Sequence, residues 1–563
     1  MKKPELKDLT LREKIGQMAL GKPSNPGYSD LERYPYGSMW ALGNIDMGVI
    51  QMKDAEGEIV TNRQRWLAGL RNMWGKTRIP LLPAMDCTAG IHNNFSETEA
   101  IMDPVTIGAT GSKELAYEAG TLRAQLLRSI GSRWMWYPEI DTICRNKAIG
   151  LGRYYSDDPD MLVEMAIAEA MGAQDNGIAA TAKHFPGADG LEYRDPHLCS
   201  TMLLSTMEEW KQGQGALFQR IIDAGICAVM TSHDAFPACD SSKINGKFRP
   251  SSISYKVVTE LLKEEMGFDG VVITDGITMR GLSALYGGDI AQVYIEAVKA
   301  GNDVILSVTD QFFDIIEDAV KRGEIDESRI DDACRRVINL KEKLGMFDDD
   351  YELYLPDLDE INRKVRDFNR RVAEKSQTLV CDNNKILPLS KDKIKNVAII
   401  YSAHDEENGS TTAAHGISAD MQVMVEEFEK RGAKVHFQRR LKCAEEIKKL
   451  AAENDLLVYA GYLMRYCPHS VICGFFDEEI DTFSFALQAG AEKTVAVGMG
   501  SPFMWFDYYT NFPTFINIYN PRAASQRAFV AALYGEIEFG SYHPFELIPE
   551  EYRRRFDKLG IEY

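Results

Sequence analysis

The sequence lacks any long hydrophobic run. Its 563 residues contain no uninterrupted apolar stretch of about 18 residues, which is roughly the length that a transmembrane helix needs. The opening residues, "MKKPELKDLTLREKIGQMAL", carry two lysines but no apolar segment behind them, so they predict a helix and not a secretory signal. We therefore expect no membrane partner. A chain of this length predicts two or three domains.

Positive charge is also scarce. Lys and Arg number 64 against 84 Asp and Glu, which gives a net charge of −20, and no basic cluster is large enough to predict nucleic-acid binding. The ten cysteines are scattered without a CxxC spacing, which excludes the zinc-ribbon and redox-pair patterns and is typical of a reducing cytoplasm. We predict a cytoplasmic protein that does not bind nucleic acid, and the composition leaves a homodimer open.

Short apolar runs separated by polar turns and amphipathic segments recur through the first 347 residues. Nearly continuous apolar runs of this kind are typical of strands buried on both faces of a parallel sheet. Their alternation with helical segments predicts a (β/α)8 barrel of the TIM type. The runs cover residues 79–86, 132–141, 178–185, 226–233, 270–275 and 302–307.

A second series of strands and helices follows an acidic, proline-containing stretch, "DDDYELYLPDLDE", at residues 348–360. Its apolar runs cover residues 396–403, 433–438, 455–461, 493–500 and 514–520. This pattern predicts an open α/β sandwich. We therefore predict a catalytic barrel domain over residues 1–347, a linker over 348–375 and a C-terminal α/β sandwich domain over 376–563.

Polar side chains gather where the predicted barrel strands end. In a parallel barrel the active site lies at the carboxyl ends of the strands. One aspartate at such a position can equally be the cap of the next helix, but several charged groups meeting at one barrel mouth predict a site. These residues are Asp86, Asp141, Lys183, His184, His233 and Asp275.

An ordered set of motifs resembles glycoside hydrolase family 3. "KHFPG" at 183–187 and "GVVITDG" at 270–276 carry the resemblance. It is supported by "GRYYSDDP" at 152–159, "KAGND" at 299–303, "NNKILPL" at 383–389 and "GSPFMW" at 500–505. The barrel followed by a second α/β domain is similar to the two-domain plan of that family, so the resemblance covers nearly the whole chain. It implies a retaining β-glycosidase without cofactor or metal.

The resemblance also implies roles for individual residues. Asp275 falls on the family's nucleophile, and a carboxylate at a strand end can attack an anomeric carbon to form a glycosyl-enzyme. Lys183, His184, Asp86 and Arg153 fall on family residues that bind sugar hydroxyls, a task suited to charge-assisted hydrogen bonds.

The proton donor is predicted in the loop after "KHFPG". The β-N-acetylglucosaminidases of the family carry Asp-x-His there, and this chain has Asp195-Pro196-His197, with proline where serine is usual and in a loop one residue longer. Histidine suits acid–base work because its ordinary pKa, about 6.5, lies near working pH, and Asp195 can orient it. His233 matches a histidine of the same branch, which places it either near the nucleophile, among the sugar-binding residues, or packed under the barrel rim.

These features predict an exo-acting β-N-acetylhexosaminidase (β-N-acetylglucosaminidase) with Asp275 as nucleophile and His197, paired with Asp195, as acid/base. Three alternatives stay open. One is a β-glucosidase or β-xylosidase that uses a carboxylate such as Glu478 or Glu479. The others are a glycoside phosphorylase and a catalytically silent sugar-binding protein. His184, His197 and His233 do not have the HxxxH spacing of a metal site.

Overall fold

The computed structural model describes residues 2–42, 61–73, 76–88, 90–142, 151–188, 190–192, 194–348, 355–403, 421–462, 482, 484–540 and 542–561. They form two compact units. The first comprises Met1–Ile101, Ala116–Lys147 and Val163–Val365, and the second comprises Met102–Leu115, Ala148–Leu162 and Arg366–Tyr563. Two short segments of the predicted barrel domain thus group with the C-terminal residues, and the boundaries of the linker stay a prediction.

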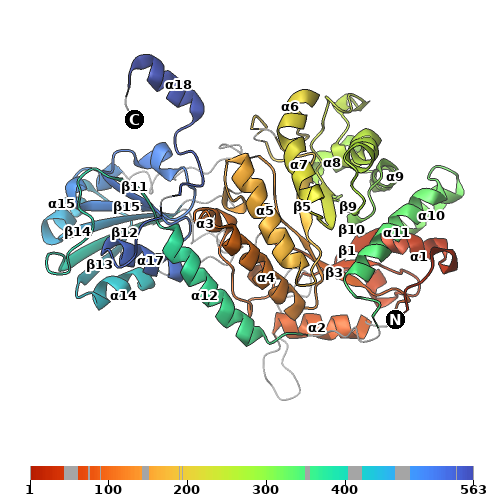
Figure 1. Ribbon diagram of the computed structural model, residues 1–563, viewed down its shortest axis with the longest axis horizontal. Coiled ribbons are helices and arrows are strands. Elements are labelled where there is room, and N and C mark those ends of the chain that lie inside the picture. The colour runs from red at the N-terminus through yellow and green to blue at the C-terminus, as the bar shows by residue number, and fades with distance from the viewer. Residues whose placement is uncertain are drawn as a thin grey trace. The chain divides into compact units, whose positions relative to one another are not determined.

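Eight parallel strands form a barrel in the described part of the first unit (Figure 1). One run pairs in the order β10 (Ile305–Val308), β1 (Ala19–Gly21), β2 (Ser38–Trp40), β3 (Leu82–Asp86), β4 (Trp134–Trp136). The other run pairs in the order β5 (Thr181–Phe185), β6 (Ala228–Thr231), β9 (Val271–Thr274). Parallel bridges from Trp134 to Ala179 and from Ile273 to Val304 join the two runs. The strands therefore close into a ring, and the predicted barrel fold is confirmed.

Strands β1 and β2 were missing from the sequence prediction. Each has three residues, and β1 follows helix α1 (Leu11–Met18) directly. Three residues are too few to show the alternation or the apolar run by which a strand is recognised. Their backbone pairs with β10 and β3, so partners distant in sequence define them.

Helices follow the barrel strands and cover the ring. The interior between the strands is filled by one apolar cluster that includes Leu20, Ala84, Trp136, Met230 and Ile273. A TIM barrel is a packed core in this way and not a pore. The larger helices of this part of the chain are α2 (Asn62–Met73), α4 (Lys113–Ser129), α5 (Pro159–Gln174), α6 (Met207–Gln212), α7 (Gln214–Asp223), η6 (Lys256–Glu265), α9 (Ile290–Ala300), α10 (Gln311–Lys321) and α11 (Glu327–Lys343).

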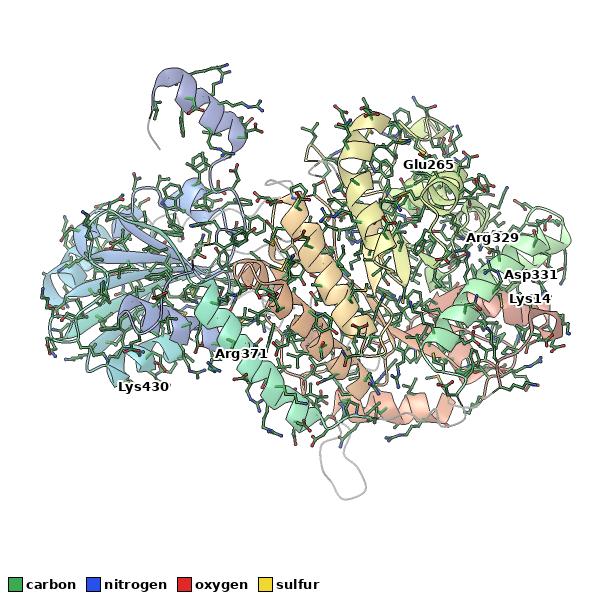
Figure 2. The ribbon with its side chains drawn as sticks, in the orientation of Figure 1. Lys14, Glu265, Arg329, Asp331, Arg371 and Lys430 are labelled. Atoms are coloured by element: carbon green, nitrogen blue, oxygen red, sulfur yellow. The ribbon has the colours of Figure 1, made fainter. Side chains whose placement is uncertain are left out.

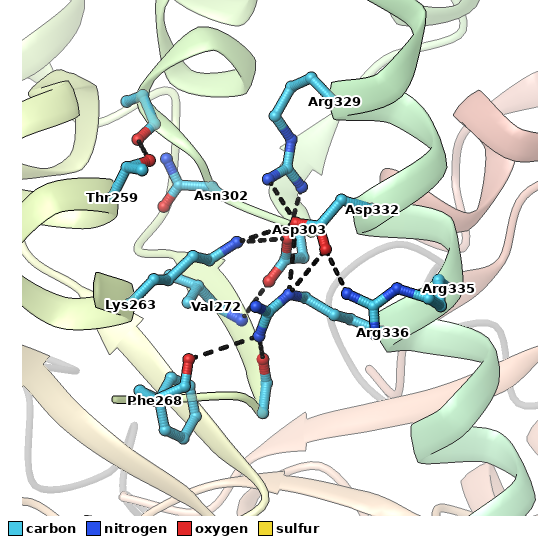
Figure 3. Close-up of polar contacts among 12 residues, drawn as sticks. Thr259, Lys263, Phe268, Val272, Asn302, Asp303, Arg329, Asp332, Arg335 and Arg336 are labelled. Atoms are coloured by element: carbon cyan, nitrogen blue, oxygen red, sulfur yellow. Dashed lines mark hydrogen bonds and ion pairs between the residues drawn. The ribbon is translucent and has the colours of Figure 1, made fainter. Parts of the chain in front are cut away.

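Charged side chains hold α11 against the amino-terminal ends of the strands. Asp303, just before β10, is buried and accepts hydrogen bonds from the Val272 N–H at 2.9 Å, the Lys263 ammonium at 2.7 Å and the Arg329 guanidinium at 2.5 Å (Figure 3). On α1, Lys14 contacts Asp331 of α11 at 2.7 Å, and both are labelled in Figure 2. The aspartate of "KAGND" therefore supports the barrel at the end opposite the carboxyl ends of the strands.

Lys341 of α11 is a fully buried lysine at the same amino-terminal ends of the strands. Its ammonium donates to Gln17 Oε1 at 2.7 Å, to the Gly37 carbonyl at 2.8 Å and to the Pro80 carbonyl at 2.7 Å. These acceptors come from α1 and from the segments that enter β2 and β3. One side chain thus links three separate parts of the barrel.

Lys341→Met is expected to lower the free energy of unfolding by roughly 3 kcal/mol or more, because each buried acceptor left without a donor costs about 1–3 kcal/mol. Urea denaturation of the variant measures this change. The control is Lys321→Met, since Lys321 is exposed and only pairs with Glu317 on the surface of α10, a contact worth about 0.5 kcal/mol. Equal losses in the two variants would contradict the linking role of Lys341.

The same lysine makes stability depend on pH. Burial lowers the pKa of Lys341 to about 7, whereas a solvated lysine has a pKa of about 10.4. Between these values the unfolded chain binds more protons than the folded one, so the contribution of Lys341 to stability rises with pH. We expect the difference in unfolding free energy between wild type and Lys341→Met to widen from about pH 7 to about pH 10.

The second unit is built on a six-stranded sheet with the order β11-β16-β15-β14-β12-β13 among its described residues. The strands are β11 (Thr378–Asp382), β12 (Asn396–Ala403), β13 (Lys434–Arg439), β14 (Leu456–Tyr462), β15 (Thr494–Gly498) and β16 (Thr514–Asn517). All neighbours pair in parallel except β11, which runs antiparallel to β16. The predicted α/β sandwich is confirmed; β11 was missing from the prediction.

Helices α14 (Gln422–Lys430) and α17 (Ala523–Leu533) are joined where the Met424 N–H donates to Gln526 Oε1. The side chains of α15 (Ala444–Glu453) pack on the sheet through an apolar cluster that includes Leu450, Tyr459 and Phe515. The chain also forms α12 (Leu358–Ser376) and α18 (Glu550–Leu559). Across the residues that are described, no helix has both the length and the apolar character needed to cross a bilayer.

The two short segments that join the second unit do so through polar contacts. Asn520 donates to Thr106 Oγ1 at 2.8 Å, and Arg522 pairs with Asp103 at 3.2 Å. Ser156 donates to the Pro544 carbonyl at 2.6 Å. Residues 102–115 and 151–162 are therefore held by partners several hundred residues away in the sequence.

Candidate functional site

The carboxyl ends of the barrel strands bring most of the predicted residues together. Asp86 is the last residue of β3, and Lys183 and His184 lie at the end of β5. His233 follows β6, and Asp275 directly follows β9. Parallel strands in a closed ring direct the residues that follow them to one face.

Asp275 is surrounded by donors and histidines. Its Oδ1 accepts the Gly276 N–H at 2.6 Å, and its Oδ2 lies 3.9 Å from His184 Nε2. Burial raises the pKa of Asp275, but the neighbouring histidines, His184 first and then His233 and His197, oppose that effect and hold the pKa below its usual range. The carboxylate is therefore ionised at neutral pH, as a nucleophile requires.

His184 lies between two carboxylates. Its Nδ1 is 2.8 Å from Asp141 Oδ2, and its backbone N–H donates to Asp141 Oδ1 at 3.0 Å. Burial lowers the pKa of His184, but Asp141, Asp275 and Glu139 outweigh that effect and raise the pKa above its usual value. The imidazole is thus oriented by Asp141 and presents Nε2 on the side of Asp275, where it can donate to a bound hydroxyl.

Lys183 is almost fully buried, with 2% of its side chain exposed. Its ammonium lies 3.2 Å from Asp86 Oδ1 and 3.6 Å from Glu139 Oε1. The side chain of Asp86 is 42% exposed, so this carboxylate reaches outward while Lys183 stays behind it. A buried cation and a half-exposed carboxylate can together hold neighbouring sugar hydroxyls.

Glu139 is a member of the cluster that the sequence analysis missed. It is fully buried, and the Thr88 hydroxyl donates to its Oε1 at 2.9 Å. Its sequence signal was an acid inside the apolar run "WMWYPEID", where a buried charge needs a partner. The partner, Lys183, is distant in sequence.

Glu139, Asp141 and His184 also carry ligand atoms within 4.8 Å of one another and could hold a cation. Carboxylate and imidazole are common metal ligands. The Lys183 ammonium, 3.6 Å from Glu139, already supplies a positive charge to this group, and His184 Nδ1 is bonded to Asp141. The two carboxylates are therefore placed to orient the side chains of Lys183 and His184, which is an alternative to binding a cation.

Asp195 and His197 form the predicted pair. Asp195 Oδ1 accepts the His197 backbone N–H at 2.8 Å and lies 2.7 Å from His197 Nδ1. The Asp195 side chain is 1% exposed and that of His197 is 29% exposed. A buried carboxylate thus orients a partly exposed imidazole, and since Nδ1 is engaged, Nε2 is the nitrogen suited to exchange a proton.

His233 is bonded to the protein through both ring nitrogens. Nδ1 lies 2.7 Å from the Ser252 hydroxyl and Nε2 lies 2.9 Å from the Gly276 carbonyl. Burial lowers its pKa, so it is neutral, with Nε2–H donating to Gly276 and Nδ1 accepting from Ser252. His233 therefore supports the residue that follows Asp275, and its direct contact with a sugar stays a prediction.

Two predictions concern residues outside the described barrel unit. Arg153 is buried and ends the short helix Leu151–Arg153, which belongs to the second unit, so its role at the sugar stays a prediction. Glu478 and Glu479, the alternative proton donors, lie outside the described residues.

This arrangement supplies the parts of a two-step displacement. It has an ionised carboxylate at a strand end, an oriented histidine on an adjacent loop and a set of buried charges for hydroxyl groups. Retaining glycoside hydrolysis needs a nucleophile and a second group that first protonates the leaving oxygen and then deprotonates water.

Comparison with known proteins agrees with this geometry. The model of the glycosyl hydrolase family 3 N-terminal domain matches residues 10–340. A β-N-acetylglucosaminidase/β-glucosidase of Cellulomonas fimi is 26% identical over 490 residues, covering 83% of this chain and 84% of that protein.

Two solved structures share the fold over nearly the whole chain. A β-glucoside phosphorylase, BglX, bound to 2FGlc superposes with a TM-score of 0.81 and 22% identity, covering 96% of this chain and 95% of its own. A family 3 β-N-acetylglucosaminidase from a Paenibacillus species superposes with a TM-score of 0.76 and 24% identity, covering 96% and 99%.

Proposed function

The chain belongs to glycosyl hydrolase family 3, and we propose that it is a retaining, exo-acting β-N-acetylhexosaminidase of the β-N-acetylglucosaminidase type. The observation that carries this proposal is the Asp195–His197 pair, with 2.7 Å between Asp195 Oδ1 and His197 Nδ1. Burial raises the pKa of the Asp275 carboxyl, and His184, His233 and His197 lower it, so the imidazole of the pair contributes to the electrostatic environment of the nucleophile. The relatives named for N-acetylglucosaminide hydrolysis support the same choice.

In the first step of the proposed reaction, an Asp275 oxygen attacks the anomeric carbon as the bond to the leaving oxygen breaks. His197 Nε2 gives its proton to that oxygen. In the second step His197 takes a proton from water, and the resulting hydroxide displaces Asp275. Asp195 keeps Nδ1–H in place and stabilises the imidazolium, as the carboxylate of a Ser-His-Asp triad does.

Lys183, His184 and Asp86 are proposed to hold the hydroxyl groups of the terminal sugar. Lys183 is already paired with Asp86 and Glu139, and His184 is already paired with Asp141. Little reorganisation is therefore needed when the sugar binds. Arg153 is proposed to add a further donor. The exo mode of action, in which one terminal sugar is released, is part of the same proposal.

A panel of 4-nitrophenyl β-glycosides tests the sugar assignment. We expect kcat/KM for the N-acetylglucosaminide to exceed that for the glucoside and the xyloside by about tenfold or more, because a pocket built for one substituent discriminates by at least about 1.4 kcal/mol. The matched comparison is the N-acetylgalactosaminide, which differs only at one hydroxyl. A higher kcat/KM for the glucoside or xyloside would overturn the N-acetylhexosaminidase proposal.

A glycoside phosphorylase is the second candidate, favoured by the likeness to the β-glucoside phosphorylase structure and by the proposed histidine acid/base. A neutral imidazole would repel an incoming phosphate less than a carboxylate would. Turnover measured with and without inorganic phosphate decides between the two. Release of free sugar at an unchanged rate supports hydrolysis, and formation of a sugar 1-phosphate supports phosphorolysis.

A further inference from the structure

The segment 194–202, called here the acid–base loop because it carries Asp195 and His197, is docked on the start of helix α8 (Arg280–Ser283). The Arg280 N–H donates to the His197 carbonyl at 3.2 Å. The Ser200 hydroxyl donates to the Gly281 carbonyl at 3.3 Å. No side chain caps the first turn of α8, so the backbone of His197 supplies an acceptor there.

Gly281 makes this docking close. A Cβ atom built on Gly281 would lie 2.4 Å from the Pro196 carbonyl oxygen and 2.5 Å from the Cys199 carbonyl oxygen. Both neighbours are backbone atoms of the acid–base loop, so they could make room only if the loop itself moved. The requirement at this position is therefore space for a close backbone approach, which glycine alone provides.

The ends of the acid–base loop are held separately. Glu192 accepts hydrogen bonds from the Arg194 N–H at 3.1 Å, the Arg194 guanidinium at 2.5 Å and the Met202 N–H at 3.2 Å. Beyond Met202, the Leu203 N–H donates to the Ala235 carbonyl at 2.8 Å. Glu192 thus bridges the two ends of the loop.

The docking point and Asp275 belong to one short stretch, residues 275–281. Asp275 accepts the Gly276 N–H, and the Gly276 carbonyl accepts His233 Nε2–H and the Met279 N–H, both at 2.9 Å. His233, which follows strand β6, therefore supports the turn between Asp275 and α8 through its hydrogen bond to the Gly276 carbonyl. A displacement of the loop relative to α8 would be a displacement relative to Asp275.

We propose that Gly281 is a positioning residue for acid–base catalysis: its missing side chain lets the acid–base loop dock on α8 and sets the position of His197 relative to Asp275. This inference rests on the proposed function of His197. It adds that the proton donor is placed by backbone packing of its loop against the segment of the nucleophile, in addition to its hydrogen bond with Asp195.

The test compares two substrates of the preferred sugar, a 2,4-dinitrophenyl glycoside and a disaccharide. An activated aryl leaving group needs little protonation, whereas a sugar leaving group needs it. In Gly281→Ala we expect kcat/KM to fall about 100-fold for the disaccharide, the cost of misplacing a catalytic group by about 1 Å. For the aryl glycoside we expect a change of no more than about threefold.

Gly190→Ala is the matched control, because Gly190 lies in the same connection and no atom lies within 4 Å of a Cβ built there. It should behave as wild type with both substrates. Glu192→Ala loosens the loop from its other end without inserting an atom at α8. It should show the same substrate-dependent loss, so it tests the proposal even if Gly281→Ala does not fold.

Equal losses on both substrates in the folded variants would overturn the positioning role, and so would wild-type behaviour of both Gly281→Ala and Glu192→Ala. A His197→Ala variant measured alongside distinguishes failure of the positioning role of Gly281 from failure of the proposed function of His197. If His197→Ala keeps full activity on the disaccharide, the acid/base assignment is overturned. If it loses that activity while Gly281→Ala and Glu192→Ala do not, only the positioning role fails.

Discussion

Asp275→Asn is expected to lower kcat/KM for every β-glycoside on the order of 10⁴-fold or more, the scale of loss seen when a covalent nucleophile is removed. The amide oxygen can still accept the Gly276 N–H, which lies 2.6 Å from Oδ1 in the wild type. The variant should therefore fold, and the loss should be chemical. Steady-state kinetics and a thermal melt of the same preparation check both statements.

Asp289→Asn is the control for this change. Asp289 is exposed in the same β9–β10 connection and caps helix α9 by accepting the N–H groups of Ala291 and Gln292. Asparagine caps helices as well as aspartate does, so this variant should keep full activity. Asp275→Asn retaining activity within about tenfold of wild type would contradict the nucleophile assignment.

Because the carboxyl of Asp275 is ionised at neutral pH, its protonation can lower the reaction rate only in acidic solution. Burial raises the pKa of this carboxyl, but the neighbouring histidines hold it below the usual value of about 3.9. Any loss of kcat/KM on the acid side that appears above about pH 4 must then come from another group.

A covalent adduct trapped with a slowly released fluorinated glycoside should map to the peptide that contains Asp275.

His197→Ala is expected to reduce kcat/KM for a disaccharide by about 10²–10⁴-fold, the usual contribution of a general acid. For the 2,4-dinitrophenyl glycoside of the same sugar, kcat/KM should stay within a few-fold of wild type, because that leaving group departs without a proton. Plotting log(kcat/KM) against the pKa of a series of aryl leaving groups should therefore give a steeper slope in the variant.

The second step supplies an independent readout for His197. Without a general base, water attacks the glycosyl-enzyme slowly, but azide needs no deprotonation and should restore kcat on the activated substrate. His436→Ala is the control, since His436 is exposed on strand β13 of the second unit. A leaving-group slope equal to that of wild type would assign the proton donor to another residue, such as a carboxylate near 478–479.

The strand ends of the barrel were predictable because each depends on a short local pattern. A continuous apolar run followed by a polar residue identified β3, β5, β6 and β9, and with them Asp86, Lys183, His184 and Asp275. The same reasoning missed β1 and β2, whose three residues carry no pattern. Glu139 was missed for a different reason, because its meaning depends on Lys183, a residue more than forty positions away that lies 3.6 Å from it.

The sequence by itself determined the barrel class, the second α/β unit and the chemical types available at the strand ends, because periodicity and residue order are local properties of the chain. Only the tertiary structure decided which groups meet: that His184 is oriented by Asp141, that His233 supports Gly276, and that Gly281 leaves room for the acid–base loop. These facts depend on distances between segments distant in sequence, which close packing sets.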